Sequence, residues 1–312
     1  MDAYDRLEKI GQGAFGSVWK VRRRQDGAVV VLKRLDVTAL TRREQEDALT
    51  EVRVLARLRH PHVVAYEDSF VSGDHLYIVM EYCPQGDLRQ LLDRRQGRPL
   101  PEPDVWRCLV QLLLGLRHIH AERVLHRDLK TMNVFVAADG ALRIGDFGVA
   151  RVMGTQTQFA QTVVGTPYYL SPELCENRPY DAKSDMWALG CILYELCTLK
   201  HPFDALNQGA LILKILKGHY PPPPAHYSRP LRDMVGLLLQ RRSERRLGAH
   251  ECLAHPAVVR AAQRADIALP QEVLDLAQRL GTGDPTPGPA PGPAPVPPRQ
   301  ALEAAPAPRP LS

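Results

Sequence analysis

Three glycines, Gly11-x-Gly13-x-x-Gly16, constrain the fold of the first part of this chain. Glycine lets the backbone approach a phosphate closely and direct its amides toward it. Dinucleotide-binding folds share this spacing, and Asp36 lies about 20 residues further on, where those folds carry an acidic residue. Those folds also need a helix directly after the glycines, whereas residues 17–21 (SVWKV) continue as a strand. The pattern therefore argues against a dehydrogenase and leaves a phosphate-binding loop or a plain glycine-rich turn.

A strand-rich segment precedes a helix-rich one. Residues 4–36 alternate as strands do, with a hairpin signal at Asp26-Gly27, and residues 76–82 are typical of a buried strand. The segments expected to be helical are 41–59, 104–122 and 185–199. The fold is therefore predicted to be α+β, with a small β-rich lobe and a larger helical lobe that meet near residues 82–87.

The segment 185–199 is apolar almost all round. It is too short for a membrane span and it carries Glu195, so we expect a helix buried in the core.

Composition narrows the function classes. The 312 residues leave room for two lobes, and 40 Lys and Arg against 35 Asp and Glu give a net charge of +5. This charge is too small to predict nucleic acid or a membrane as the main partner. The first residues form no apolar signal stretch, and the six cysteines include no Cys-x-x-Cys pair, so neither a zinc site nor a disulfide framework is predicted. A reducing intracellular compartment is expected.

Proline marks the end of the folded part. Eleven of the 27 prolines lie between Pro285 and Pro310, and such a segment cannot bury apolar area. We therefore expect a helical extension over 258–281 and a disordered or extended tail over 282–312. Within the tail, Pro295-x-x-Pro298 could contact an SH3-type groove or be part of a solvated linker.

A lysine and a glutamate extend the phosphate-binding pattern. Lys33 follows the apolar strand 29–32, and a cation in a buried strand needs a phosphate or a carboxylate as partner. Glu51 lies on the expected helix 41–59, where it is placed to pair with Lys33 unless it faces solvent.

Two polar strings follow, HRDLKTMN over 126–133 and DFG over 146–148. Asp128 can orient an attacking hydroxyl and accept its proton, and Lys130 can neutralise a moving phosphoryl group. Asn133 and Asp146 offer the oxygen ligands that Mg²⁺ prefers. Phosphoryl transfer depends mainly on positioning and charge neutralisation, which these groups supply.

In these two motifs and the glycine triad, the chain resembles a eukaryotic protein kinase over residues 4–257. More narrowly, it is similar to the NIMA-related (Nek) serine/threonine kinases. The narrower likeness rests on the strings YIVMEYCPQGDL, HRDLKTMNVF, IGDFGVAR, VVGTPYYLSPEL and KSDMWALGCILYEL. It implies a bilobal fold, with an N-lobe over 4–82 and a C-lobe over 87–257, and ATP and Mg²⁺ in the cleft. It also implies transfer of the ATP γ-phosphoryl group to Ser or Thr hydroxyls of protein substrates.

The resemblance assigns roles to individual residues. Lys33 would hold the α- and β-phosphates and pair with Glu51, while Asp128 would be the catalytic base. Lys130 would meet the γ-phosphate, and Asn133 and Asp146 would hold Mg²⁺. The implied ATP-binding residues are Ile10, Gly11, Gly13, Gly16, Val18, Lys33, Glu51, Met80 as gatekeeper, and Glu81 and Cys83 in the hinge.

The resemblance also implies a switch segment between Asp146 and Glu173. Phosphorylation of Thr162 would order this segment through Arg127, by an activating kinase or by a second copy in trans. The alternative is that its threonines only bond the loop backbone. The implied structural residues are Thr166 beside Asp128 and Lys130, Asp185 and Trp187 beneath the catalytic loop, and Arg246 paired with Glu173.

Two expectations remain to be weighed. Val31 stands where the family usually has Ala, and its extra methyl groups are expected to crowd the adenine pocket. A kinase-fold scaffold without turnover is the alternative function, although Lys33, Asp128, Asn133 and Asp146 are all present. By family resemblance we expect a cell-cycle role and a cytoplasmic address at the cytoskeleton, centrosome or cilium.

Overall fold

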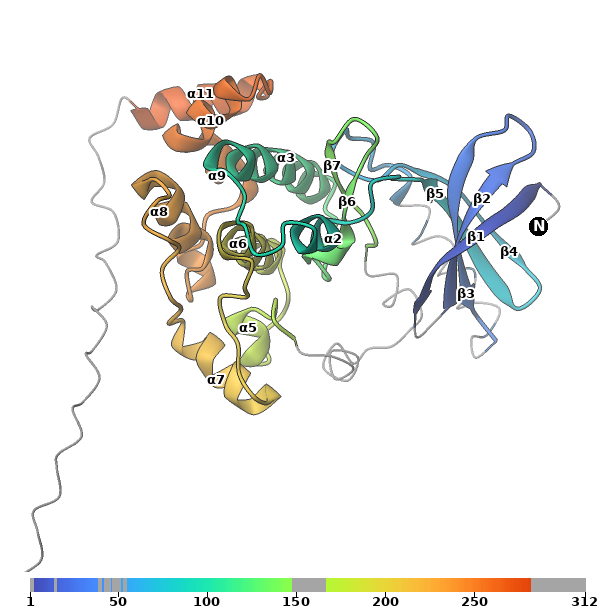
Figure 1. Cartoon of the computed structure of the whole chain (residues 1–312), viewed down its shortest axis with the longest axis horizontal. Coiled ribbons are helices and arrows are strands. Elements are labelled where there is room, and N and C mark those ends of the chain that lie inside the picture. The colour runs from blue at the N-terminus through green and yellow to red at the C-terminus, as the bar shows by residue number, and fades with distance from the viewer. Residues whose placement is uncertain are drawn as a thin grey trace, which may run out of the picture.

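A five-stranded antiparallel sheet forms the N-terminal lobe of the computed structural model, which describes residues 3–13, 16–38, 41, 46, 52, 55–147 and 167–281. The strand order is β1-β2-β3-β5-β4. The strands are β1 (Tyr4–Gly13), β2 (Gly16–Arg23), β3 (Val29–Asp36), β4 (Tyr66–Ser72) and β5 (His75–Glu81). Figure 1 shows this sheet at one end of the molecule and the helices at the other.

Local turn chemistry sets the register of the sheet. Asp26 accepts a hydrogen bond from the Ala28 amide at 3.0 Å, and Gly27 has a positive φ of 75°. The hairpin predicted at Asp26-Gly27 is therefore confirmed, and it pairs β2 with β3 so that Lys33 lies opposite Val18.

The two faces of the sheet carry separate apolar clusters. One contains Val21, Val30, Leu32, Tyr77 and Val79, and the other contains Leu35, Val37, Val52, Leu76 and Ile78. Because side chains alternate along a strand, Lys33 projects on the same face as Leu35. Strand periodicity therefore places the lysine on the face with the second cluster.

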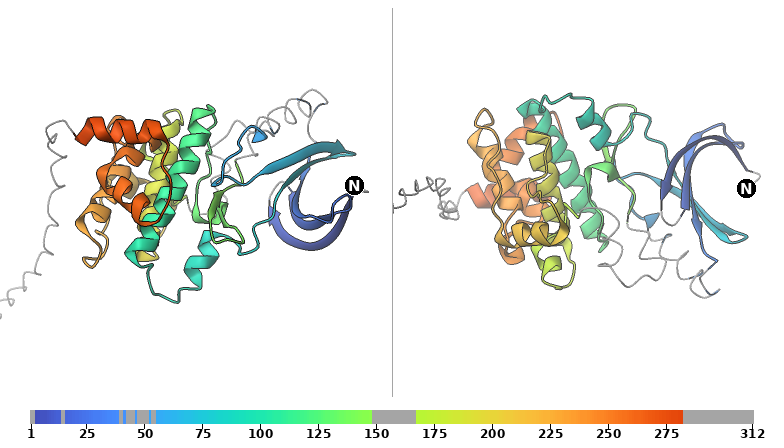
Figure 2. Two further views of the ribbon diagram at one scale, coloured as in Figure 1. Left: turned by 90° about the horizontal axis from the view of Figure 1, so that it is seen from above. Right: turned by 60° about the horizontal axis from the view of Figure 1, so that its bottom comes forward.

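The C-terminal lobe is helical and surrounds one large core. Its elements are α2 (Leu88–Asp93), α3 (Glu102–Ala121), η1 (Thr131–Asn133), β6 (Val134–Val136), β7 (Leu142–Ile144), α5 (Pro172–Cys175), α6 (Ala182–Thr198), α7 (Gln208–Lys217), α8 (Arg229–Leu238), η3 (Ser243–Arg245), α9 (Ala249–Ala254), α10 (Pro256–Arg264) and α11 (Gln271–Gly281). In both views of Figure 2 the strands lie at the N-terminal end, and α10 and α11 lie at the opposite end. The α+β, two-lobed architecture predicted from the sequence is confirmed.

Helix α6 is the buried helix expected over 185–199. Every residue from Ser184 to Cys197 is buried. Asp181 caps its first turn by accepting from the amides of Lys183 and Ser184, and Leu199 ends it in a left-handed conformation. Within the described residues, no helix is long and apolar enough to cross a membrane.

Two further expectations are only partly covered. Most of the expected helix 41–59 and the whole tail 282–312 lie outside the described residues. The extension after residue 257 is helical, but α10 already begins at Pro256, so the expected boundary lies inside this helix. All six cysteines are free thiols.

Candidate active site

The glycine triad lies on a tight β1–β2 hairpin. Gly13 pairs with Gly16, and Gly11 lies opposite Val18. A Cβ atom at Gly16 would lie 1.8 Å from the Arg34 carbonyl oxygen, so only glycine fits against β3 there. Ile10 is half-exposed beside the triad. A strand follows the glycines, as the sequence predicted.

Lys33 on β3 forms an ion pair with Asp146, which follows β7. The pair joins the two lobes, because β3 belongs to the sheet and β7 to the helical lobe. Asp146 has a left-handed backbone with φ of 55°. Glu51, the expected partner of Lys33, lies outside the described residues. The sequence predicted that Lys33 needs an anion, and in this structure Asp146 is that anion.

Asp128 gathers the polar groups of its loop. Lys130 Nζ lies 2.7 Å from Asp128 Oδ2. The Asn133 amide nitrogen donates to the Asp128 carbonyl at 2.7 Å and to Oδ2 at 3.0 Å. The half-exposed Asp128 carboxylate is thus oriented by two neighbours on its own loop.

The segment 126–133, the expected catalytic loop, is hydrogen-bonded to the residue before Asp146. The Gly145 amide donates to the Asn133 carbonyl at 2.9 Å, and the Gly145 carbonyl accepts from His126 Nε2 at 3.0 Å. His126 Nδ1 accepts from the Asp128 amide, so Nε2 carries the ring proton. The fully buried His126 ring lies 4.9 Å from the Phe147 ring.

Asp185 anchors this loop from α6. Its carboxylate accepts from the amides of His126 at 3.0 Å and Arg127 at 3.1 Å. The His120 ring and the Tyr180 hydroxyl bond the same carboxylate. Burial alone would raise the pKa of Asp185, but the bond and charge of His120, with the Tyr180 bond, keep that pKa below its ordinary value. Arg127, with φ of 68°, is held in a left-handed conformation by these bonds.

Of the two expected hinge residues, Glu81 ends β5 and Cys83 follows that strand. Met80 lines a small cavity together with Lys33 and Asp146. The Glu81 side chain pairs with Arg143 at 3.0 Å, so its carboxylate is already engaged. Cys83 is buried, and burial raises the pKa of its thiol to about 12.

The residues present fit a magnesium ion. The side-chain nitrogen of Asn133 donates both of its hydrogens to Asp128. The Oδ1 atom of Asn133 is therefore left for a cation. Asp146 follows Gly145, whose amide bonds the Asn133 carbonyl, and it supplies a carboxylate. No group of three His, Cys, Asp or Glu that could hold a metal occurs among the described residues. This is compatible with Mg²⁺, which usually takes few protein ligands and completes its shell with water and phosphate.

Glu173 and Arg246 form the expected ion pair deep in the helical lobe. Arg246 Nη1 lies 2.8 Å from Glu173 Oε1, and Nη2 lies 3.1 Å from Oε2. Ser184 also donates to Glu173 at 2.7 Å. This geometry ties α5 to α6 and to the residue that follows η3. Thr162 and Thr166 lie outside the described residues.

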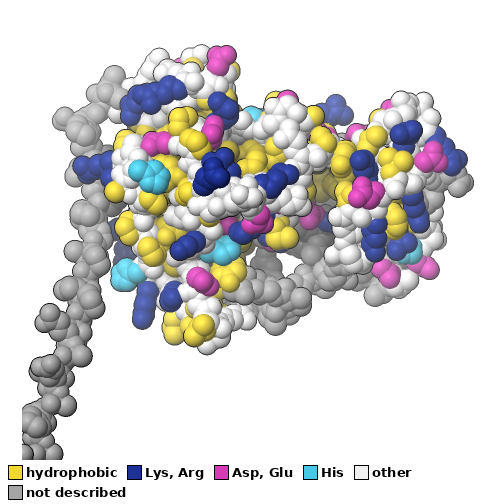
Figure 3. All heavy atoms as spheres, in the orientation of Figure 1, with side chains coloured by type: hydrophobic (Ala, Val, Ile, Leu, Met, Phe, Trp, Pro, Cys, Tyr) yellow, Lys and Arg dark blue, Asp and Glu magenta, His cyan; other side chains and the backbone are white. Residues whose placement is uncertain are grey.

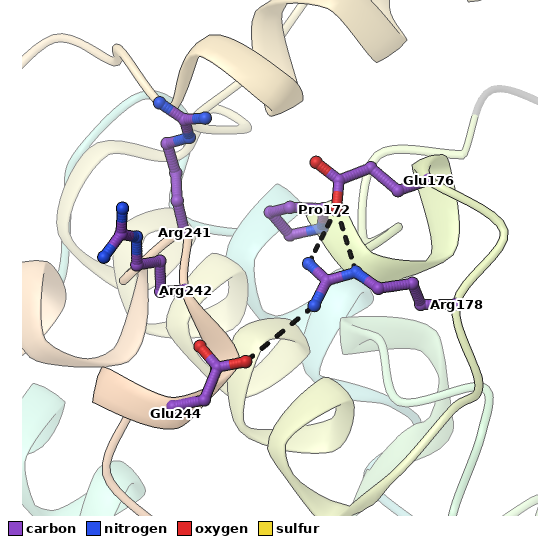
Figure 4. Close-up of a pocket in the computed structure, with 6 residues that line it drawn as sticks. All are labelled: Pro172, Glu176, Arg178, Arg241, Arg242 and Glu244. Carbon is purple, nitrogen blue, oxygen red and sulfur yellow. Dashed lines mark hydrogen bonds and ion pairs between the residues drawn. The ribbon is translucent and has the colours of Figure 1, made fainter.

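A second pocket lies near this ion pair and away from the catalytic residues. It has a volume of about 390 Å³. Its lining residues are Pro172, Glu176, Arg178, Arg241, Arg242 and Glu244 (Figure 4). Arg178 bridges Glu176 at 2.7 Å and Glu244 at 3.9 Å, while Arg241 and Arg242 extend from the other side. None of the expected ATP-binding or catalytic residues lines it, so it is separate from the candidate active site.

Sequence reasoning missed several supports of the site. His120 and Tyr180 bond Asp185, and Tyr169 bonds Thr131 in the catalytic loop. These residues come together from distant parts of the chain, and no local motif connects them.

Comparison with known proteins agrees with this geometry. The sequence matches the family model for the protein kinase domain over residues 4–258. The chain therefore belongs to the protein kinase family.

Its relatives include Nek serine/threonine kinases. The mouse serine/threonine-protein kinase Nek1 is 46% identical over 241 residues, which cover 77% of this chain and 20% of that protein. The human serine/threonine-protein kinase Nek5 is 44% identical over 241 residues, 77% of this chain and 34% of the relative. The probable serine/threonine-protein kinase nek3 of Dictyostelium discoideum is 43% identical over 264 residues, which cover 83% of this chain and 24% of that protein. This chain thus spans only a minor part of these relatives.

Proposed function

We propose that this chain is a serine/threonine protein kinase that transfers the γ-phosphoryl group of ATP to protein substrates. The observation that carries the proposal is the binding of the catalytic loop to Gly145. This contact brings the Asp128, Lys130 and Asn133 group to the residue before Asp146, and Asp146 reaches Lys33 on the sheet. These contacts support a single site in which Asp128 would be the base, Lys33 and Lys130 the cations, and Asn133 and Asp146 the metal ligands.

The chain's own groups divide the work. Asp128 accepts the proton of the acceptor hydroxyl, and Lys130 neutralises charge on the group that moves. Lys33 and Asp146 pair with each other in this structure, and Lys33 would exchange this partner for the phosphates of bound ATP. Asn133 and Asp146 would hold Mg²⁺, which would supply positive charge against the phosphates.

The remaining roles extend this proposal. Residues 4–257 would form the kinase domain, 258–281 a helical extension and 282–312 a Pro-rich tail. Phosphorylation of Thr162 by another kinase or in trans would switch the enzyme on. By resemblance to Nek kinases, the protein would act in the cytoplasm at the cytoskeleton, centrosome or cilium.

A peptide-library phosphorylation assay with ATP and Mg²⁺ tests the function. The wild-type chain should phosphorylate Ser or Thr peptides, and Asp146→Ala should abolish the activity. Activity that survives Asp146→Ala would show a contaminating kinase or a wrong metal assignment. An inactive wild-type chain, after treatment with an activating kinase, would favour the scaffold.

A further inference from the structure

Two lysines lie on one face of the N-terminal sheet. Lys33 on β3 lies opposite Val18 on β2, and Lys20, which follows Val18 by two residues, lies opposite Val31. Cross-strand partners share a face of a sheet, and so do residues two apart in a strand. Lys20 therefore projects on the same face as Lys33, one strand repeat further from the glycine hairpin.

Lys20 contacts an aromatic ring, whereas Lys33 pairs with a carboxylate. The Nζ atom of Lys20 lies 4.7 Å from the centroid of the Tyr82 ring, and both side chains are half-buried. Among the residues that the structure describes, no carboxylate pairs with Lys20. A cation over a ring face is attracted by the ring electrons, and the attraction grows as water is excluded. The ring of Tyr82 is therefore the partner that stabilises this cation.

This contact spans a strand of the sheet. β2 and β5 are separated by β3, and Tyr82 directly follows β5. It begins the segment that crosses from the sheet to α2 (Figure 1). Lys20 thus reaches over β3, on the face that carries Val31, to the connection between the two lobes. The next residue along that connection is Cys83, one of the expected ATP-binding residues.

A second contact between a cation and a ring lies on the opposite face of β2. Arg6 of β1 lies over the Trp19 ring, at 5.1 Å from its centroid. Because Trp19 precedes Lys20 in the strand, its side chain projects to the other side, where it packs against the cluster around Val21. The two faces of one strand thus carry the same kind of contact, but only that of Lys20 lies on the face of Lys33.

We propose that Lys20 and Tyr82 form a clasp that slows the release of the nucleoside triphosphate. In the proposed function, β2 binds the nucleotide from one side through Gly16 and Val18, and the segment after β5 binds it from the other side through Cys83. Release requires these two sides to separate, and the contact between Lys20 and Tyr82 opposes the separation. The inference rests on the proposed function, and it makes both residues positioning residues for ATP.

The test measures nucleotide binding to the purified full chain. ATP with Mg²⁺ is titrated to obtain the Kd, and excess ATP displaces a fluorescent ATP analogue to obtain the dissociation rate. Lys20→Met keeps the stem and removes the charge, whereas Tyr82→Leu removes the ring. Each should raise the Kd by roughly three- to tenfold through faster dissociation, while kcat at saturating ATP stays within about twofold. Unchanged dissociation rates in both variants would overturn the inference.

Matched variants separate the clasp from general stability of the sheet. Lys20→Arg keeps a cation and Tyr82→Phe keeps the ring, so each should retain a Kd within about twofold of wild type. Arg6→Met removes the corresponding charge from the opposite face of β2 and should leave the Kd unchanged. A rise in Kd with Arg6→Met equal to that with Lys20→Met would show a general loosening of the sheet and would overturn the clasp.

Adenosine separates the clasp from a direct attraction between Lys20 and the phosphates. Adenosine carries no phosphate, so the clasp predicts that Lys20→Met weakens adenosine and ATP by the same factor. Direct attraction would weaken ATP alone. The double variant of Lys20→Met with Tyr82→Leu should bind ATP no worse than the weaker single variant, because both substitutions break one contact. A loss confined to ATP, or strictly additive effects, would contradict the clasp.

Failure of this inference can be told apart from failure of the proposed function. A wild-type chain that neither binds ATP with Mg²⁺ nor phosphorylates a peptide removes the function itself. A wild-type chain that does both, with Lys20→Met and Tyr82→Leu equal to it in Kd and dissociation rate, removes only the clasp. If Lys20→Met does not fold, Tyr82→Leu tests the same contact from the other side.

Discussion

Arg246 and Glu173 form a two-pronged ion pair in which both side chains are almost completely buried. Their exposed fractions are 0% and 3%. Arg246 also lies over the Trp187 ring, at 5.1 Å from its centroid, and donates to the Gln240 carbonyl. Because the pair is cut off from water, each charge depends on the other for compensation.

Arg246→Met should therefore destabilise the protein. The substitution keeps apolar bulk against Trp187 but leaves Glu173 as an uncompensated buried charge. We expect the free energy of unfolding to fall by about 3–5 kcal/mol in urea titrations. Arg178→Met is the matched control, because its pair with Glu176 is nearly half exposed on both sides, and it should cost less than about 1 kcal/mol. Equal effects of the two variants would contradict the prediction.

The same pair sets a pH dependence of stability. Burial alone would raise the pKa of Glu173, but the bonds and charge of Arg246 and the bond from Ser184 lower it below its ordinary value. A carboxyl with a lowered pKa in the folded state contributes stability above its unfolded pKa and loses it as the pH falls through the folded pKa. Stability should therefore decrease with acidification below about pH 4.3, the usual value for Glu.

Urea titrations at a series of acidic pH values check this dependence. Glu173→Gln should show a shallower loss of stability on acidification than wild type, whatever its stability at neutral pH. Parallel pH profiles for the two proteins would contradict the assignment.

The helices and strands could be predicted from neighbouring residues in the sequence. The contacts of the candidate site could be predicted less well, because they join residues far apart in the chain. The Asp26-Gly27 turn and the apolar run around Glu195 each specify their element from neighbouring residues. The partner of Lys33 could not be fixed in the same way. Asp146 lies 113 residues away, and the choice between it and Glu51 depends on how the lobes are arranged.

The supports of the catalytic loop were beyond sequence reasoning for the same reason. His120 and Asp185 are 65 residues apart, and Tyr169 and Thr131 are 38 apart. Each is an ordinary helix or loop residue when taken alone. On the face shown in Figure 3, Lys and Arg side chains are interspersed with Asp and Glu.

Gly16→Ala should disrupt the nucleotide side of the cleft. The added Cβ would meet backbone atoms of Arg34, which cannot turn aside as a side chain can, so β2 and β3 must separate locally. We expect the KM for ATP to rise on the order of tenfold, since 1.4 kcal/mol corresponds to this factor.

Gly209→Ala provides the matched control. This glycine lies in the first turn of α7, and the nearest atom to an added Cβ is 3.6 Å away. Alanine favours helix, so this variant should be as stable as wild type or more stable. An unchanged KM for ATP in Gly16→Ala would show that the hairpin accommodates the added methyl group without weakening nucleotide binding.

Val31→Ala should leave ATP binding equal or tighter. Val31 lies opposite Met80 in the pairing of β3 with β5, and its side chain is mostly buried. Removing two methyl groups there opens space for the adenine ring. Titration with ATP and Mg²⁺ measures the Kd, and clear weakening would show that the valine supports the ring instead of crowding it.

The ion pair of Lys33 and Asp146 is partly exposed, unlike the buried pair of Arg246 and Glu173. Asp146 is 41% exposed, so water already compensates part of its charge and the pair adds little stability. Lys33→Met and Asp146→Asn should therefore shift the Tm by no more than about 4 °C, since a loss of 1 kcal/mol has at most this effect in a chain of this size. Both should nevertheless lower kcat/KM for ATP by more than roughly 100-fold, because phosphoryl transfer depends on the charges that these groups supply. Paired melting and phosphorylation measurements test this separation. A large drop in Tm with kcat/KM preserved in the folded fraction would mean that the pair is structural, like Arg246 with Glu173, and that the phosphates are held by other groups.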